Sequence, residues 1–235
     1  MKTHRIAAVL TLLLAGPALA ERPVVAPMKS EGAHLPRLVA FHDAKVRAKV
    51  DRLLAKHEAA DRAARRDCRQ QVRESGHGDD FFEYDETTEV TYVSARYVSL
   101  RVRTNYDCAG AHPDGTTEGI TIDLATGDPL DWRKVFKPGF LVEGEKPSAL
   151  RKLYQARYPK DGNDDPDCRD VVANGFDADF ILTLDAHDGL MAEPEFPHVI
   201  QACGDALGFK AQALAPYAAD KGFLADLDAT VRAKK

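Results

Sequence analysis

From Asp43 to Val72 the chain repeats apolar side chains at steps of three and four residues, a spacing that places them on one stripe of an α-helix. The segment Ser75-Gly76-His77-Gly78 follows and is typical of a helix end. One long amphipathic helix is therefore predicted, and the remainder of the chain has to cover its apolar stripe. The stripe consists of Val46, Val50, Leu53, Leu54, His57, Ala60, Ala64, Cys68 and Val72.

The segments after this helix have the residue pattern of β-strands. Residues 89–94 and 97–104 are rich in Val, Tyr and Thr, and apolar residues alternate with polar ones in 97–104 and in 120–124. We expect the polar face of 97–104, which carries Ser99, Arg101 and Arg103, to lie in water. The second half of the chain predicts a helix at 148–158, a strand hairpin over 180–193 and a last helix from Asp220. The fold class predicted is α+β, with an antiparallel sheet packed against a long amphipathic helix plus shorter C-terminal helices.

The first twenty residues resemble a secretory signal peptide. A basic start with Lys2 and Arg5 precedes an apolar stretch at 6–14 and a small-residue cleavage site at 18–20. The segment 21–36 holds three prolines and predicts an extended lead-in. Residues 37–235 are then interpreted as a single α+β domain, with the N-terminal helix and first strand segment in 37–95 and the remaining core in 96–235.

Charge and hydropathy limit the location and the partners. Removing Lys2 and Arg5 from the 32 basic residues leaves 30 against 37 acidic ones, a net charge of −7. This negative net charge disfavours binding to nucleic acid or to anionic lipid and favours binding to a cationic partner. No later apolar run is long enough to cross a bilayer, so the mature protein is expected not to span a membrane and to be periplasmic or secreted.

Four cysteines remain after export: Cys68, Cys108, Cys168 and Cys203. In an oxidising compartment an even number indicates disulfides, and four cysteines allow three pairings. Cys68 lies on the apolar stripe of the long helix, and Cys108 lies at the end of the strand expected to pack on that helix. We therefore predict the pairs Cys68–Cys108 and Cys168–Cys203.

Motifs for catalysis or for a cofactor are missing from the sequence. It has no G-x-S-x-G elbow, no H-E-x-x-H, no phosphate-binding loop and no dinucleotide fingerprint, so we expect neither an enzyme nor a cofactor. The candidate binding residue is His112, in a small-residue loop between two strands, and the alternative is that it only fixes the shape of that loop.

Two clusters of charged residues have a functional and a structural interpretation. The acidic loop from Asp161 to Asp170 begins like a calcium-binding loop, but Pro166 and Val172 stand where an EF-hand needs Gly and Glu, so a solvated loop is favoured and no metal is predicted. Four arginines of the long helix are interpreted as a solvated face rather than an anion site. They are Arg62, Arg65, Arg66 and Arg69.

The central part of the chain resembles a known family. Gly110-Ala111-His112-Pro113, Asp123-Leu124, Thr126-Gly127, Leu130 and Phe136 are similar to the motif of the domain-of-unknown-function 3298 family, the extracytoplasmic domain of lysozyme-sensing anti-sigma factors and of some cell-wall deacetylases. The resemblance implies an exported α+β protein with a binding role. The first glycine of the motif is Ala109 here, and no membrane helix or sigma-binding segment accompanies it.

Three functions follow from this resemblance and from the charge. The first is an exported cell-envelope protein that binds or inhibits a cationic, lysozyme-like cell-wall hydrolase. The second is a module that binds peptidoglycan fragments, for which Trp132, Tyr154 and Tyr158 are expected beside one groove. The third is an unrecognised envelope hydrolase, which predicts a cleft with convergent carboxylates or His112.

Overall fold

The computed structural model describes residues 24–26, 35–110, 112–141, 147–176 and 178–233. The predicted signal peptide at 1–20 and most of the lead-in lie outside these residues. Within the lead-in, β1 (Val24–Ala26) forms a short antiparallel pair with β2 (Arg37–Ala40).

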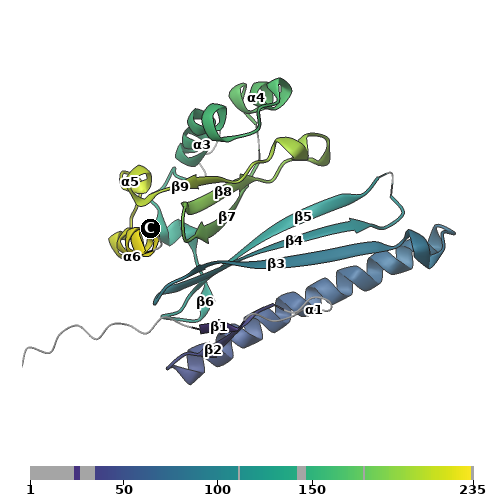
Figure 1. Ribbon diagram of the computed structural model, residues 1–235, viewed down its shortest axis with the longest axis horizontal. Helices are drawn as coiled ribbons and strands as arrows, with labels where there is room; N and C mark the ends of the chain where they lie inside the picture. The colour runs from purple at the N-terminus through teal and green to yellow at the C-terminus, as the bar shows by residue number, and fades with distance from the viewer. Residues whose placement is uncertain (1–23, 27–34, 111, 142–146, 177, 234–235) are drawn as a thin grey trace, which may run out of the picture.

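The long helix is confirmed as α1 (Ala44–Glu74). The carboxylate of Asp43 accepts the N–H groups of Lys45 and Val46 and so caps the start of the helix. Its buried side chains include Val50 and Leu54, which pack against one face of a sheet and form a first hydrophobic core. Figure 1 shows α1 running beneath this sheet over most of its length.

The sheet above α1 is antiparallel and has the strand order β3-β4-β5-β6. It is longer than the sequence pattern predicted, because polar residues without a clear apolar alternation extend β3 and β4 at the end of the sheet opposite β6. The short helix η1 (Asp79–Phe81) leads into β3. The strands are β3 (Glu83–Val93), β4 (Tyr97–Asp107), β5 (Asp114–Asp123) and β6 (Asp128–Pro129).

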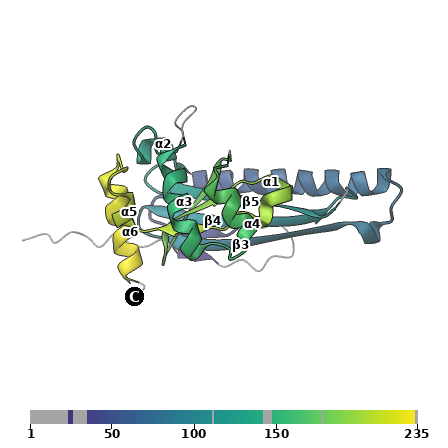
Figure 2. The same cartoon turned by 90° about the horizontal axis from the view of Figure 1, so that it is seen from above.

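A second antiparallel sheet, with the order β7-β8-β9, lies across the other face of the first sheet at one end and carries most of the helices (Figures 1 and 2). A second, aromatic-rich core lies between this sheet and its helices. The α+β class is confirmed, with strands divided between two larger sheets. The elements are α2 (Trp132–Val135), α3 (Ala149–Asp161), α4 (Pro166–Ala173), β7 (Phe180–Asp185), β8 (Gly189–Pro194), η2 (His198–Cys203), β9 (Leu207–Phe209), α5 (Ala211–Leu214) and α6 (Lys221–Ala233).

The two sheets touch where small residues of β4 and β5 meet β7. A Cβ atom on Gly119 would lie 2.5 Å from the carbonyl oxygen of Leu182, so only glycine permits this approach. The buried hydroxyl of Ser99 accepts the N–H of Leu184 at 2.9 Å and lies 2.8 Å from the hydroxyl of Thr121. The expectation that Ser99 lies in water is therefore wrong, because the second sheet covers this end of the polar face.

Both predicted disulfides are present. Cys68 of α1 bonds to Cys108, just after β4, and Cys168 of α4 bonds to Cys203 at the end of η2. The first bond ties the long helix to the far end of the sheet. The second attaches η2 to the helical layer, and two disulfides are typical of an oxidising, extracytoplasmic compartment.

We predict that Gly119→Ala lowers the free energy of unfolding by about 2–3 kcal/mol, since the new methyl group would overlap backbone atoms of β7. Urea unfolding measures the change. Gly110→Ala is the matched control, because a Cβ atom there meets its nearest neighbour at an ordinary 3.7 Å. Equal stability of the two variants would contradict a tight sheet contact.

Candidate functional site

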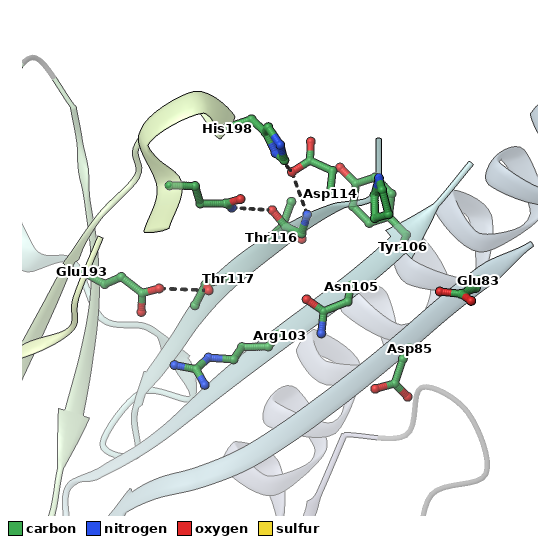
Figure 3. Close-up of a pocket in the computed structure, with 13 residues that line it drawn as sticks. Glu83, Asp85, Arg103, Asn105, Tyr106, Asp114, Thr116, Thr117, Glu193 and His198 are labelled. Atoms are coloured by element: carbon green, nitrogen blue, oxygen red, sulfur yellow. Dashed lines mark hydrogen bonds and ion pairs between the residues drawn. The ribbon is translucent and has the colours of Figure 1, made fainter. Parts of the chain in front are cut away.

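A groove opens where the two sheets diverge (Figure 3). Its volume is about 580 Å³, its floor is the face of β3, β4 and β5 opposite α1, and η2 and the end of β8 form the facing wall. The lining is mostly polar or charged. It consists of Glu83, Asp85, Arg103, Asn105, Tyr106, Pro113, Asp114, Gly115, Thr116, Thr117, Glu193, His198 and Gln201.

Strand alternation places the charged side chains on the groove floor. Glu83 and Asp85 of β3 are two residues apart, so both point to the face opposite α1, and both are exposed. Arg103 of β4 lies on the same face and is also exposed. Among the described residues none of the three has an ion-pair partner. The open floor therefore presents two carboxylates and one guanidinium to an incoming ligand.

The inner end of the groove is closed by a paired charge. Glu193 of β8 forms an ion pair with Arg101 of β4, and the side chains of both are only 16% exposed. Its other carboxylate oxygen accepts the hydroxyl of Thr117 on β5 at 3.1 Å. Arg101 was expected to lie in water, and this prediction is wrong because β8 covers it.

The outer wall is attached to the sheet by a histidine pair and one carboxylate. His112, the candidate binding residue, is exposed, and its ring stacks on that of His198 with 3.8 Å between centroids. Nδ1 of His198 lies 3.1 Å from the carboxylate of Asp114, and Nδ1 of His112 lies 3.2 Å from the carbonyl oxygen of Pro113. His112 thus contacts both its own loop and η2. We refer to His112, Asp114 and His198 as the histidine clasp.

Electrostatics favours the ionised state of the clasp carboxylate. The N–H of Gly115 and the ring of His198 both hydrogen-bond to Asp114, and these contacts lower its pKa below the usual value. The side chain of Gln201 donates to the carbonyl of Gly115 at 2.8 Å and adds a second link between η2 and β5. His198 and Gln201 were not found from the sequence, because no local spacing relates η2 to the loop that it contacts.

The other charged clusters noted in the sequence have structural partners. Residues predicted as an acidic loop include the end of α3 and the start of α4, where Asp161 pairs with Arg157 and Asp165 caps α4. Two of the four arginines of α1 have contacts at the start of β3, although Arg69 is still exposed to solvent. The guanidinium of Arg65 donates to the carbonyl of Tyr84, and that of Arg69 lies over a phenyl ring of the β3 region.

The three aromatic residues expected beside one groove are not together. Tyr154 and Tyr158 are fully buried in the second core, and each hydroxyl donates to a backbone carbonyl. Trp132 is partly buried and lines a separate cavity of about 470 Å³ together with Leu130 and Phe180. Of these three residues, Trp132 alone remains available for stacking on a ligand.

A second polar cavity, of about 310 Å³, lies between α1 and the sheet. The buried carboxylate of Glu58 accepts the N–H of Leu35 and the guanidinium of Arg37 there. Burial, together with a hydrogen bond to the carboxyl of Asp61, raises the pKa of Glu86 to about 8. The folded protein consequently keeps a proton on Glu86 at neutral pH.

We predict that this proton makes stability fall with rising pH. The unfolded chain releases it near pH 4.5 and the folded protein near pH 8, so the contribution of Glu86 is lost between these values. Allowing for partial exposure to solvent, the loss is about 1–2 kcal/mol. Urea unfolding at pH 5 and pH 8 measures it. Glu86→Gln should flatten the profile, whereas Glu89→Gln, on the same strand but exposed, should leave it unchanged.

The described residues limit the chemistry of the molecule. Within them no group of three or more His, Cys, Asp or Glu side chains is arranged to hold a metal ion, and all four cysteines are in disulfides. None of their helices is long and apolar enough to cross a membrane. The fold and the groove define a disulfide-bonded α+β protein with a polar groove between two antiparallel sheets, and the two disulfides indicate an extracytoplasmic compartment.

Comparison with known proteins shows the fold. No family model and no curated protein matches the sequence. A crystal structure of a member of the domain-of-unknown-function 3298 family from Bacteroides fragilis is similar over 83% of this chain and 86% of the other, with a TM-score of 0.54 and 15% sequence identity. The family resemblance found in the central motif is confirmed as a shared fold.

Proposed function

We propose that the protein is a periplasmic or secreted binding protein, without catalytic activity, whose groove captures a cationic cell-wall hydrolase of the lysozyme type. The observation that carries this proposal is the pair Glu83 and Asp85, two carboxylates without an ion-pair partner among the described residues, on the floor of an open groove. A cationic protein surface complements them, and the net charge of −7 for residues 21–235 acts in the same direction at long range.

The shape and composition of the groove favour a protein over a small molecule. Its lining is largely polar and open, whereas sites for small ligands are mostly apolar and enclosed. Val199, next to the groove-lining His198 on η2, is 87% exposed and offers an apolar anchor of the kind found within protein interfaces. The resemblance to lysozyme-sensing extracytoplasmic domains supports the choice of partner.

We expect Glu83→Gln/Asp85→Asn to weaken binding of chicken-type lysozyme at least about tenfold at 0.15 M salt, where attraction between distant exposed charges is largely screened. Calorimetric titration measures the affinity, and a cell-wall lysis assay reports inhibition. Asp167→Asn/Asp188→Asn is the control, because it changes the net charge equally at exposed positions outside the groove lining. Absence of lysozyme binding by the unsubstituted protein would refute this partner.

A second candidate function is binding of peptidoglycan fragments. The supporting observation is the cavity beside Trp132, which combines an aromatic surface with the polar groups of Asp131, Arg133 and Asp179 at its edge. Titration with muropeptides distinguishes the two functions, since Trp132→Ala would abolish fragment binding and leave lysozyme binding intact.

A further inference from the structure

The strand β3 lies at an edge of its sheet in the part of the chain that the structure describes. Among the described residues it pairs only with β4, and it lies along one side of the sheet (Figure 2). An exposed edge presents unpaired N–H and C=O groups that can pair with another chain. β3 therefore adds a row of backbone donors and acceptors beside the groove.

The register shows which backbone groups point outward. The carbonyls of Gly115 and Thr121 on β5 bond away from β4, to Gln201 and Leu130 respectively. The backbone groups of even-numbered residues of β5 consequently form hydrogen bonds with β4. Because Thr116 of β5 pairs with Thr104, even-numbered residues of β4 form their backbone hydrogen bonds with β5. The backbone hydrogen bonds between β4 and β3 are then formed by the odd-numbered residues of both strands.

This parity leaves Glu86 and Thr88 with backbone groups that face away from β4. At each end of this edge an outward carbonyl already accepts a hydrogen bond. The guanidinium of Arg65 donates to the carbonyl of Tyr84, and the N–H of Ala186 donates to the carbonyl of Thr91. With respect to the described residues, the stretch 85–90 therefore has no backbone partner on its outer side, and it is long enough for one short strand.

The charges along β3 select what can pair there. Asp85 and Glu89 lie on the groove face of this stretch, with Glu83 just before it. A second copy of the same edge would bring carboxylates close to carboxylates, and like charges on adjacent strands are destabilising. A segment with Lys or Arg at alternate positions would instead oppose them with complementary charge.

We propose that the edge of β3 at 85–90 accepts an extended basic segment of the partner protein as an additional strand, whose alternate Lys or Arg side chains lie against Asp85 and Glu89 at the mouth of the groove. This inference rests on the proposed function for the nature of the partner and adds the mode of recognition. Backbone pairing supplies affinity, and the carboxylates select for positive charge.

The test uses a blocked peptide, acetyl-Lys-Thr-Lys-Val-Lys-Thr-amide, and two variants of equal charge. One variant is N-methylated at the three lysines and the other at the remaining three residues. In an added strand the backbone N–H groups of only one of these two sets of residues point toward β3 and donate hydrogen bonds to it. The variant methylated on that set should therefore bind at least about tenfold more weakly than the parent peptide, and the other variant nearly as well. Equal affinity of all three peptides would show attraction by charge alone and overturn the proposal.

Hydrogen exchange locates the contact. Bound parent peptide should protect the amides of Glu86 and Thr88, whereas those of Thr87 and Glu89 are already protected by β4. Thr88→Pro removes an outward N–H without removing a bond to β4 and should weaken binding, and Thr88→Ala is the control. Unchanged exchange at residues 86 and 88 would also overturn the proposal, even if Thr88→Pro failed to fold.

The same measurements with lysozyme separate the two proposals. Lysozyme binding that depends on Glu83 and Asp85, with exchange at residues 86 and 88 unchanged and equal peptide affinities, would retain the proposed function and reject strand addition. If only one of the two methylated peptides bound weakly and lysozyme did not bind, the edge site would be retained and lysozyme would be rejected as the partner.

Discussion

The close contact between the two sheets at Gly119 is the constraint on which the rest of the structure depends. Because Gly119 has no Cβ atom, the backbone of β7 approaches β5 directly, and the buried N–H of Leu184 finds its acceptor in the hydroxyl of Ser99. Without that hydroxyl, a buried donor would lose its partner. Farther along β4 the side chains on this face are larger and polar, among them Arg103 and Asn105. The change in side-chain size along β4 accounts for a tight contact at one end and a groove at the other.

Burial along the groove determines how its charges are arranged. At the inner end, where the sheets are close, Arg101 and Glu193 are paired, as expected for charges removed from water. At the outer end solvent reaches the floor, and Glu83, Asp85 and Arg103 remain without ion-pair partners among the described residues. The wall formed by η2 is held on one side by the Cys168–Cys203 disulfide and on the other by the histidine clasp. Such a preorganised wall reduces the entropic cost of binding.

The acidic residues of β3 have two consequences that arise from the same physics. Charged side chains on an edge strand oppose pairing between identical copies, which protects an open edge from self-association. The same carboxylates favour pairing with a basic segment. One set of side chains therefore both opposes self-association and selects for a positively charged partner. The edge and the groove lie next to each other, and a single partner surface can contact both.

Sequence patterns predicted the elements that depend on local or periodic features. The helix α1, the α+β class and the Cys68–Cys108 pair follow from patterns that are visible in the chain, and Cys168–Cys203 follows as the remaining pair. The predicted stripe of α1 is buried near its ends, whereas Ala60 and Ala64 are exposed. The sequence did not predict the polar extensions of β3 and β4, the helix α4 or the role of η2. In the extension of β3 the groove face is exposed, and the face toward α1 carries half-buried polar residues such as Glu86 and Thr88, so no apolar alternation marks it. The capping of α4 by Asp165 was hidden in a run of acidic residues.

The sequence by itself determined the framework, because helix periodicity, strand alternation and cysteine placement act through neighbours along the chain. Only the tertiary structure decided the site. His112 is part of the histidine clasp because η2 brings His198 beside it, and Arg101 is partly buried because β8 brings Glu193 to it. These contacts join segments far apart in sequence, so no local pattern in the chain could reveal them.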